Sequence, residues 1–463
     1  MARKQRRRRQ ERRQEHARRE KRTRHSVITG AAVTAGGILG VAQPAFADTF
    51  VVNAADDTGD GICQDATAGD CTLRDAVLES NDNTGVFDHI TFASSITGVT
   101  LGGTELGVTE GVYIYGNGAK ATSISGDNAS RLFNLDPAYD EPVVFRDLTL
   151  TEGAAGGGYG GAIYNQDANL NIFDSVLTEN SGNKGGAIAD TGADGQNIDI
   201  SDSTLSDNTA ADDGAAFFAG GSAGEISNST ISGNHAGSTG DDYGGGVFIS
   251  DDSYFYDSTI AGNSAGYGGC IYVKLGVGAT AYVSNSIVSD NSATAPGGNF
   301  PPGPDIYGTT TAGFSLIEST DDSLVLTEDP VGTNVIGSDP QLGVLQDNGG
   351  PTPTQKPATA SPVIDTGLSD SSLDQRGSTR PFDVPSIANG VGGDASDVGA
   401  VELQAADFPA PPSGGGNASP PPPASATGQR AAALKKCKRK AKKKHLTKKQ
   451  QKKCKKKAKG LPV

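Results

Sequence analysis

One seven-residue phrase recurs five times in the middle of this chain, and its spacing limits the possible fold more than any other feature. The asparagines that close the five copies are 26 to 29 residues apart. A period in the twenties is typical of a solenoid, in which each copy of a repeat forms one turn. The copies are DSVLTEN from Asp174, DSTLSDN from Asp202, NSTISGN from Asn228, DSTIAGN from Asp257 and NSIVSDN from Asn285.

Two columns of apolar residues flank the serine of each copy, one three positions before it and the other two positions after it. Because these offsets differ in parity, both columns can face the interior only if the chain bends between two strands. A third strand, often beginning GGAI, follows each phrase. Three short strands per repeat predict an all-β fold, a right-handed parallel β-helix with turns stacked about 4.8 Å apart. The columns are Ile172, Ile200, Ile226, Phe255 and Val283, and then Leu177, Leu205, Ile231, Ile260 and Val288.

The closing asparagine of each phrase is expected to form a turn. Asparagine tolerates left-handed backbone, and its amide can bond to the copy above. Stacking of the repeats therefore explains these asparagines without a catalytic or binding role. The turn asparagines are Asn180, Asn208, Asn234, Asn263 and Asn291.

The third strand of each repeat is apolar on both faces, so one of its columns faces outward unless loops cover it. An exposed apolar patch of that extent marks an interaction site, which predicts a binding stripe for a glycan or a protein. Cover by loops, or simple strand propensity, is the alternative. Cys270 in this strand is expected to be an unpaired, partly buried thiol. The stripe consists of Tyr164, Phe218, Ile249 and Tyr272.

These features resemble the pectate-lyase-like β-helix superfamily, and more closely the GGAI-and-Asn repeats of polymorphic outer-membrane and autotransporter passenger proteins. The resemblance implies a β-helix over residues 90–304. It does not fix a function, because this fold carries both enzymes and binding proteins.

Residues 1–47 have the pattern of a secretory signal peptide. An Arg-rich start and a mildly apolar middle precede Ala45-Phe46-Ala47, after which cleavage is expected. A basic arm that binds nucleic acid is the alternative, but it leaves the apolar run and the AFA site unexplained. General secretory and twin-arginine export both remain open. No later run reaches the roughly 20 apolar residues of a membrane span, so no transmembrane helix is expected in the mature chain.

Residues 48–89 are predicted to cap the solenoid. Thr72 opens a helix with Asp75 at the capping-box position, and this helix could cover the unpaired strand edges. The string CTLRDAV, from Cys71, resembles the CSLREA-type domain at the start of secreted bacterial repeat proteins. Cys63 and Cys71 close a short loop in an exported chain, which predicts a disulfide.

Calcium is the one cofactor that the cap suggests. Asp56, Asp57, Asp60 and Gly61 are similar to the start of an EF-hand loop, but Thr67 stands where that loop needs glutamate. A solvated turn is therefore favoured, and no cofactor is expected.

Residues 305–404 contain the strings DIYGTTTAGFSLIES, DPQLGVLQDNGGPTPTQ, DQRGSTRP and DVGAVELQ. In this order they resemble the choice-of-anchor Q domain of bacterial surface β-helices, which implies surface retention and no chemistry. Residues 405–429 form a linker rich in Pro, Gly and Ser. The Lys-rich tail, 430–463, contains Cys437 and Cys454, which could close a helical hairpin.

Charge is divided sharply along the chain. Lys and Arg number 9 against 51 Asp and Glu in residues 48–429, a net −42, and 17 against 0 in residues 430–463. An acidic body repels nucleic acid and polyuronate. The tail is expected to bind anionic cell-wall polymer or lipid headgroups, or else to remain solvated. The protein is therefore expected to be secreted and retained at the cell surface.

Few residues suit catalysis. Polysaccharide lyases of this fold need strong bases, and only Arg146, Lys184 and Lys274 are basic between residues 145 and 299. The body holds two histidines, His89 and His235. We therefore expect a non-catalytic protein that adheres to glycan or protein at the cell envelope. A hydrolase or lyase that uses loop carboxylates is the alternative, and calcium binding or simple solvation are other readings of those acids. The loop acids are Asp212-Asp213, Asp241-Asp242 and Asp251-Asp252.

Overall fold

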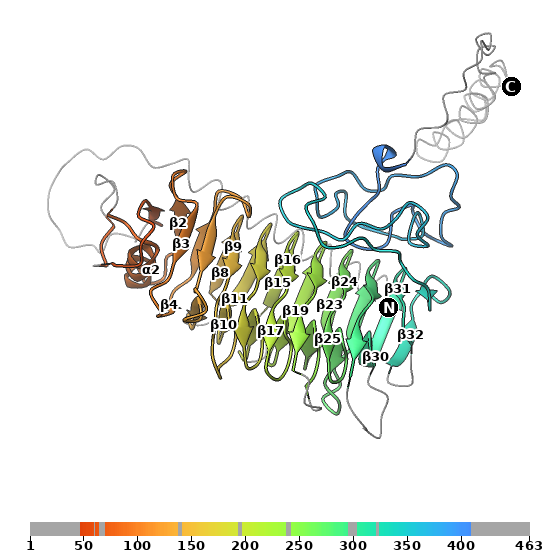
Figure 1. Ribbon diagram of the computed structural model, residues 1–463, viewed down its shortest axis with the longest axis horizontal. Helices are drawn as coiled ribbons and strands as arrows, with labels where there is room; N and C mark the ends of the chain where they lie inside the picture. The colour runs from red at the N-terminus through yellow and green to blue at the C-terminus, as the bar shows by residue number, and fades with distance from the viewer. Residues whose placement is uncertain are drawn as a thin grey trace, which may run out of the picture. The chain divides into compact units, whose positions relative to one another are not determined.

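The computed structural model describes residues 47–59, 61–63, 70–137, 141–192, 197–237, 242–294, 303–320 and 324–408. Within them the chain is an all-β parallel solenoid with very little helix (Figure 1). The predicted signal sequence before Ala47, most of the linker and the Lys-rich tail with Cys437 and Cys454 lie outside the described residues.

Each turn of the solenoid passes in order through face C, face A, face B and a small face D, and like strands of successive turns pair in parallel. Face A consists of β1 (Thr49–Val52), β2 (Asp88–Phe92), β5 (Val112–Tyr115), β8 (Pro142–Arg146), β11 (Asn169–Phe173), β15 (Asn197–Ser201), β19 (Ala223–Ser227), β23 (Ser253–Tyr256), β27 (Ala281–Ser284), β30 (Ile306–Gly313) and β32 (Leu324–Glu328). Face B consists of β3 (Gly98–Thr100), β6 (Ser123–Ser125), β9 (Thr149–Thr151), β12 (Val176–Thr178), β16 (Thr204–Ser206), β20 (Thr230–Ser232), β24 (Thr259–Ala261), β28 (Ile287–Ser289), β31 (Leu316–Ile317) and β33 (Val335–Ile336).

The other two faces are built from shorter strands. Face C consists of β4 (Leu106–Val108), β7 (Phe133–Leu135), β10 (Ile163–Asn165), β14 (Ile188–Asp190), β18 (Phe217–Ala219), β22 (Val247–Ile249), β26 (Ile271–Val273) and the start of β30. Face D consists of β13 (Ser181–Gly182), β17 (Thr209–Ala210), β21 (His235–Ala236), β25 (Ser264–Ala265) and β29 (Ser292–Ala293).

The bend that the repeat requires lies between face A and face B. The first residue of each phrase, Asp or Asn, has a positive φ near 50°, as at Asp174 and Asn228. Short polar residues adopt this left-handed conformation at the least cost. The bend turns both predicted columns inward, and Ile172, Leu177 and their equivalents are at most 1% exposed. The serines face inward as well, where each hydroxyl accepts from a backbone N–H of the preceding turn, as Ser203 does from Ser175 at 3.1 Å.

The turn asparagines form a buried ladder along the edge of face B. Asn208 donates from its backbone N–H and its amide to Asn234 Oδ1 at 3.0 and 2.9 Å, and Asn234 repeats both bonds to Asn263. The predicted bonding between copies is therefore present. The left-handed residue, however, is the one before the asparagine, such as Asp207 at φ 54°. The side-chain amide, not an unusual backbone conformation, explains why Asn occupies this position.

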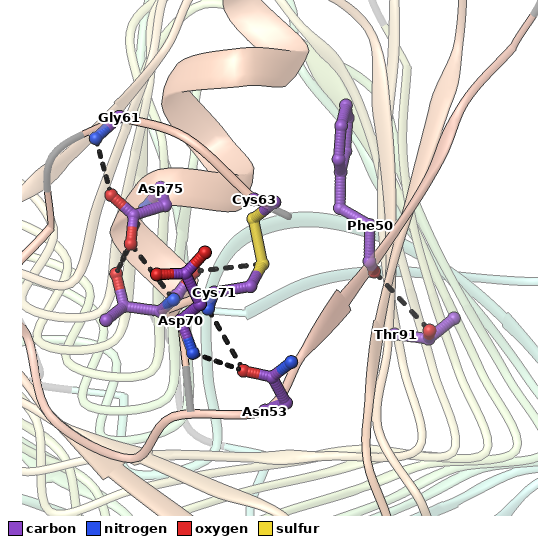
Figure 2. The surroundings of a disulfide bond; sticks show 9 residues. Phe50, Asn53, Gly61, Cys63, Asp70, Cys71, Asp75 and Thr91 are labelled. Carbon is purple, nitrogen blue, oxygen red and sulfur yellow. Dashed lines mark hydrogen bonds between the residues drawn. A yellow bond between two sulfur atoms is a disulfide. The ribbon is translucent and has the colours of Figure 1, made fainter. Parts of the chain in front are cut away.

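The N-terminal cap contains α2 (Leu73–Asp82), which begins at the predicted capping box of Thr72 and Asp75. Leu73, Ala76 and Val77 are buried on one face of this helix. Cys63 and Cys71 form a disulfide beside the helix start (Figure 2). The adjoining chain is fixed by Asn53, whose Oδ1 accepts from the backbone N–H groups of residues 70 and 71 at 3.0 Å.

Reducing the Cys63–Cys71 disulfide should loosen this cap locally. The cross-link closes a loop across 8 residues, and a loop of that size stabilises by about 2 kcal/mol through the unfolded state. Hydrogen exchange of the α2 amides should therefore accelerate about thirtyfold in reductant or in a Cys63→Ser/Cys71→Ser variant. Exchange at Asn208 in the solenoid serves as the control and should not change. Unchanged α2 exchange would contradict a stabilising role.

The solenoid extends further than the sequence predicts. Parallel pairing continues beyond residue 304 through β30, β31 and β32 to Ile336 in β33. The later turns lack the repeated phrase, so the sequence pattern ends before the solenoid does. After Ile336 the chain forms a segment of turns with a short 3-10 helix, η1 (Ala405–Asp407), and we call residues 338–408 the strap.

The strap packs on the outside of face B (Figure 1). Gln375 accepts from Thr230 Oγ1 at 2.6 Å, and the backbone N–H of Ala400 donates to Thr259 Oγ1 at 3.1 Å. An apolar cluster joins face B residues such as Ile287 to strap residues such as Val398. The predicted choice-of-anchor region thus supplies two last turns of the solenoid and a cover for face B.

Candidate functional site

The outside of face C carries the predicted binding stripe, and the strand register corrects one of its members. Tyr164 lies beside Ala189, Ala189 beside Phe218, Phe218 beside Phe248, and Phe248 beside Tyr272. Ile249 lies one column further along and is fully buried in the core. Phe248 therefore replaces Ile249 in the outward column.

A run of three glycines explains the misassignment of Ile249. Each face C strand from β10 onward follows a left-handed glycine, such as Gly214 at φ 64°, and in the fourth repeat this residue is Gly244 at φ 70°. Aligning on the second glycine of the run, Gly245, shifts the strand by one residue. A shift of one residue exchanges the inward and outward columns.

Face C carries a row of stacked rings on its outside, which we call the aromatic face. Phe218 and Phe248 stack with centroids 4.8 Å apart, Phe248 and Tyr272 are 5.5 Å apart, and Tyr272 and Tyr307 are 5.1 Å apart. A second column lies beside the first, where Tyr243 is 4.4 Å from Tyr272. The aromatic face consists of Tyr159, Tyr164, Phe218, Tyr243, Phe248, Tyr267, Tyr272 and Tyr307.

The stacking makes the aromatic face less open than the predicted stripe. Phe218, Phe248, Tyr272 and Tyr307 are only 6% to 9% exposed, because rings on neighbouring turns cover one another. Tyr159 at the N-terminal end is 39% exposed. The surface therefore offers ring edges and tyrosine hydroxyls along its length, and a more open ring at one end.

A lysine and two carboxylates interrupt the aromatic face. Lys184 Nζ binds Asp213 Oδ2, lies 3.2 Å from Asp212 Oδ2 and sits 5.1 Å from the Phe218 ring centroid. Asp213 Oδ1 also accepts from the backbone N–H of Tyr243 at 3.2 Å. This arrangement fixes a polar group within the stack of rings.

Burial shifts the protonation of this group. It raises the pKa of Asp213 to about 6, against the lowering effect of its bond to Lys184. Burial would lower the pKa of Lys184, but hydrogen bonds and charges from Asp213 and Asp212 outweigh it and raise that pKa. Burial and neighbouring tyrosines also raise the pKa of Tyr272, so its hydroxyl stays protonated at neutral pH.

Among the other predicted acids with described positions, Asp242 lies next to this cluster, whereas Asp251 and Asp252 lie apart from it. Asp242 is buried just before Tyr243, while Asp241 lies outside the described residues. Asp251 and Asp252 lie after β22, at the opposite end of the face C strands, where Asp252 Oδ1 accepts from the backbone N–H of Thr280 at 3.0 Å. Asp242 therefore lies at the same corner as Asp213, one turn further along, whereas Asp251 and Asp252 lie at another corner.

The remaining candidate residues have structural surroundings. His89 stacks on Tyr113 of face A at 5.0 Å, and burial lowers its pKa. His235 shares a hydrogen bond of 2.8 Å with Ser264. Cys270 is free and fully buried rather than partly buried, because its side chain faces the core.

In the cap, Asp56 and Asp57 hold the chain locally. Asp56 accepts from the hydroxyl of Thr58 at 2.6 Å, and Asp57 pairs with Arg74 at 2.8 Å. Asp60 lies outside the described residues. Across the described ranges, His, Cys, Asp and Glu form no group of three or more that could hold a metal ion.

Sequence reasoning missed the second aromatic column. Tyr159, Lys184, Asp213, Tyr243 and Tyr267 each immediately precede the left-handed glycine of their turn. The sequence contains this column as five dipeptides, YG, KG, DG, YG and YG, which are spaced at the repeat period. The residue types differ between copies, so no single type marks this column.

No family model, curated protein or solved structure matches this chain. Within the described part of the chain, no helix has the length and apolar character to span a membrane.

Proposed function

We propose that this protein is exported, is retained at the cell surface and binds an extended glycan along the aromatic face without cleaving it. The observation that carries the proposal is the length of that face, whose outer column runs from Tyr164 to Tyr307 along successive turns and carries a ring in each turn except at Ala189. Outward positions of a strand that faces water are usually polar. A row of rings there favours a ligand.

The aromatic face suits a linear polymer with many hydroxyl groups. Its tyrosines combine an apolar ring with a hydroxyl that can donate and accept. The turns repeat about every 4.8 Å along the solenoid, so equivalent contacts recur along an extended chain. Rings held by stacking also lose little entropy on binding.

Charge favours a neutral glycan over an anionic one. Lys184 is neutralised by Asp212 and Asp213, and the body carries 9 basic against 51 acidic residues. A polyuronate would meet net repulsion. The Lys-rich tail, residues 430–463, supports retention on anionic polymer or lipid headgroups at the cell envelope.

A polysaccharide hydrolase is the second candidate, and the surroundings of Asp213 favour it. A carboxyl whose pKa is raised to about 6 suits a general acid, and Asp212 beside it could act as the second carboxylate. Lys184, however, contacts both carboxylates. A reacting sugar would have to displace this ammonium before both acids could act.

The double variant Tyr159→Ala/Tyr164→Ala should weaken binding of the preferred neutral polysaccharide at least tenfold. These rings stack 5.4 Å apart at the open end of the aromatic face, and buried aromatic anchors contribute about 2 kcal/mol or more to an interface. Affinity would be measured by calorimetry across a panel of neutral and acidic polysaccharides. The matched control is Tyr254→Ala/Tyr282→Ala on face A, which removes a pair stacked at 4.9 Å and should leave affinity unchanged.

Two results would contradict this proposal. Equal loss of affinity in both double variants would remove the aromatic face as the binding surface. New reducing ends or unsaturated products, present with the unmodified protein and absent with Asp213→Asn, would establish the hydrolase or lyase instead.

A further inference from the structure

The interface between the strap and face B encloses a cluster of charged side chains. Asp257 reaches it from the bend between β23 and β24, and Arg380, Asp397 and Glu402 reach it from the strap. All four residues are buried, and Arg380 and Glu402 have fully buried side chains. The cluster thus lies where the strap meets the solenoid.

One guanidinium, that of Arg380, contacts most of the groups in this cluster. Arg380 lies 3.1 Å from Glu402 Oε2 through Nε and 3.4 Å from Asp257 Oδ1 through Nη1, and its Nη2 donates to the carbonyl of Gly399 at 2.8 Å. The neighbouring Arg376 forms an ion pair with Asp374 at 2.7 Å. Ionised groups removed from water need matching partners, and carboxylates exceed guanidiniums here.

Other carboxyl groups of the strap add to the excess of carboxyls over guanidiniums. Asp397 accepts backbone N–H groups from Asp365 at 2.9 Å and from Leu403 at 2.7 Å, and the backbone N–H of Glu402 donates to Asp374 at 3.0 Å. Five carboxyls, from Asp257, Asp365, Asp374, Asp397 and Glu402, are therefore buried in this region, against the two guanidiniums of Arg376 and Arg380. The charged groups facing Glu402 are Arg380, Asp397, Asp374 and Arg376, whose Nη2 donates to the Glu402 carbonyl at 2.7 Å. Asp257 faces Arg380, and Asp383 adds negative charge near Asp365.

We propose that the strap is a pH-sensitive latch, which is docked on face B in mildly acidic conditions and lifts from it as the pH rises above neutral. The folded and docked strap encloses more carboxyls than the two guanidiniums can balance. The docked strap therefore holds protons that a lifted, hydrated strap releases.

The direction in which docking depends on pH, and the pH range over which it changes, follow from the pKa values of the buried groups. Burial, and then the charge of Asp397, raises the pKa of Glu402 from 4.5 to about 8. Burial raises the pKa of Asp397 and of Asp365 from 3.8 to about 6. A raised pKa contributes stability that is fully present below the unfolded pKa and is lost as the pH rises through the folded pKa. Docking should therefore be strongest near pH 4 and weaken progressively up to about pH 8.

Lifting the strap would uncover a second surface. Thr204, Thr230 and Thr259 form one outward column of face B, and their hydroxyls now bond to Pro353, Gln375 and the backbone N–H of Ala400. In the next turns Ile287 and Leu316 are packed against the strap. These residues are at most 1% exposed while the strap is docked.

Hydrogen exchange of the full chain between pH 5 and pH 8.5, corrected for intrinsic exchange, tests the latch. The informative amides are Gly399, which donates to the carbonyl of Asn285, and Ala400, which donates to Thr259. Their opening equilibrium should rise between pH 6 and pH 8 by up to about tenfold per pH unit for each proton released. Solenoid amides such as Asn234 should remain protected throughout.

Two variants sharpen this test. Glu402→Gln removes the carboxyl with the highest pKa in the cluster. It should flatten the rise in the opening equilibrium of Gly399 and Ala400 between pH 6 and pH 8. Asp347→Asn breaks only the exposed pair with Lys120, in which both side chains are at least half exposed, and should keep the original slope. Protection of Gly399 and Ala400 that is constant with pH, or that falls in acid, would overturn the proposal. Simultaneous exposure of the Asn234 amide would also overturn it, because the whole fold would then be opening.

Discussion

Replacing Asn234 with alanine should lower the free energy of unfolding by about 3 kcal/mol. Its Oδ1 accepts two bonds from Asn208, and its Nδ2 donates to the carbonyl of Leu205 at 3.0 Å. The variant leaves the buried backbone N–H of Asn208 and the carbonyl of Leu205 without these partners. Each buried group that loses its partner costs about 1–3 kcal/mol. Urea unfolding followed by circular dichroism measures the loss.

The control for this prediction is His235→Ala at the next position. His235 is exposed, and its ring bonds only to the hydroxyl of Ser264 among the hydrogen bonds seen here. This variant should change stability by less than about 0.5 kcal/mol. A loss as small as this in Asn234→Ala would mean that the asparagine ladder does not stabilise the solenoid.

Replacing Phe217 with alanine should lower the free energy of unfolding by about 4 kcal/mol. Phe217 lies in the inward column of face C, is 1% exposed and is among the largest fully buried side chains. Truncating a buried phenylalanine to alanine costs about 3–5 kcal/mol, because transfer energy is lost and a cavity remains. The unfolding midpoint in urea should fall, with little change in the slope of the transition.

Phe218→Ala provides the matched comparison, because the two phenylalanines are adjacent and face opposite sides of one strand. Phe218 loses its stacking on Phe248 at 4.8 Å, but it leaves no hole in the core. A stacked aromatic pair contributes about 0.5–1.5 kcal/mol beyond burial. Its loss should be clearly smaller than that of Phe217→Ala. The reverse order would mean that the inward and outward columns of face C are exchanged.

The sequence was sufficient to predict the solenoid because the phrase repeats where stacking demands it. A bend, an inward serine and an edge asparagine each recur once per turn, as Ser203, Asn208 and their equivalents show. These requirements are local to the turn and its neighbours. They leave a periodic trace that can be read without knowing any long-range contact.

The register of face C was harder to predict, because the spacing of the repeats varies. The three glycines from Gly244 to Gly246 leave the start of the strand ambiguous by one residue. Glycine has no side chain that could show which of them bends left-handed. That one residue decided whether Phe248 or Ile249 faced outward.

The strap could not be placed from sequence at all. Its contacts join residues such as Thr230 and Gln375, which are 145 positions apart, and no periodicity relates them. The sequence also does not indicate the buried cluster around Arg380, because an isolated Asp or Glu in a turn-rich segment is expected to be solvated. Only the fold shows that these carboxyls are enclosed together.

Footprinting of tyrosines with and without a bound neutral polysaccharide tests the proposed binding surface most directly. Hydroxyl-radical labelling followed by mass spectrometry reports the solvent access of each ring. The ligand should protect Tyr159, Tyr164 and Tyr267, while Tyr254 and Tyr282 on face A should remain labelled as before. Protection of the face A pair, with unchanged labelling of the aromatic face, would contradict it.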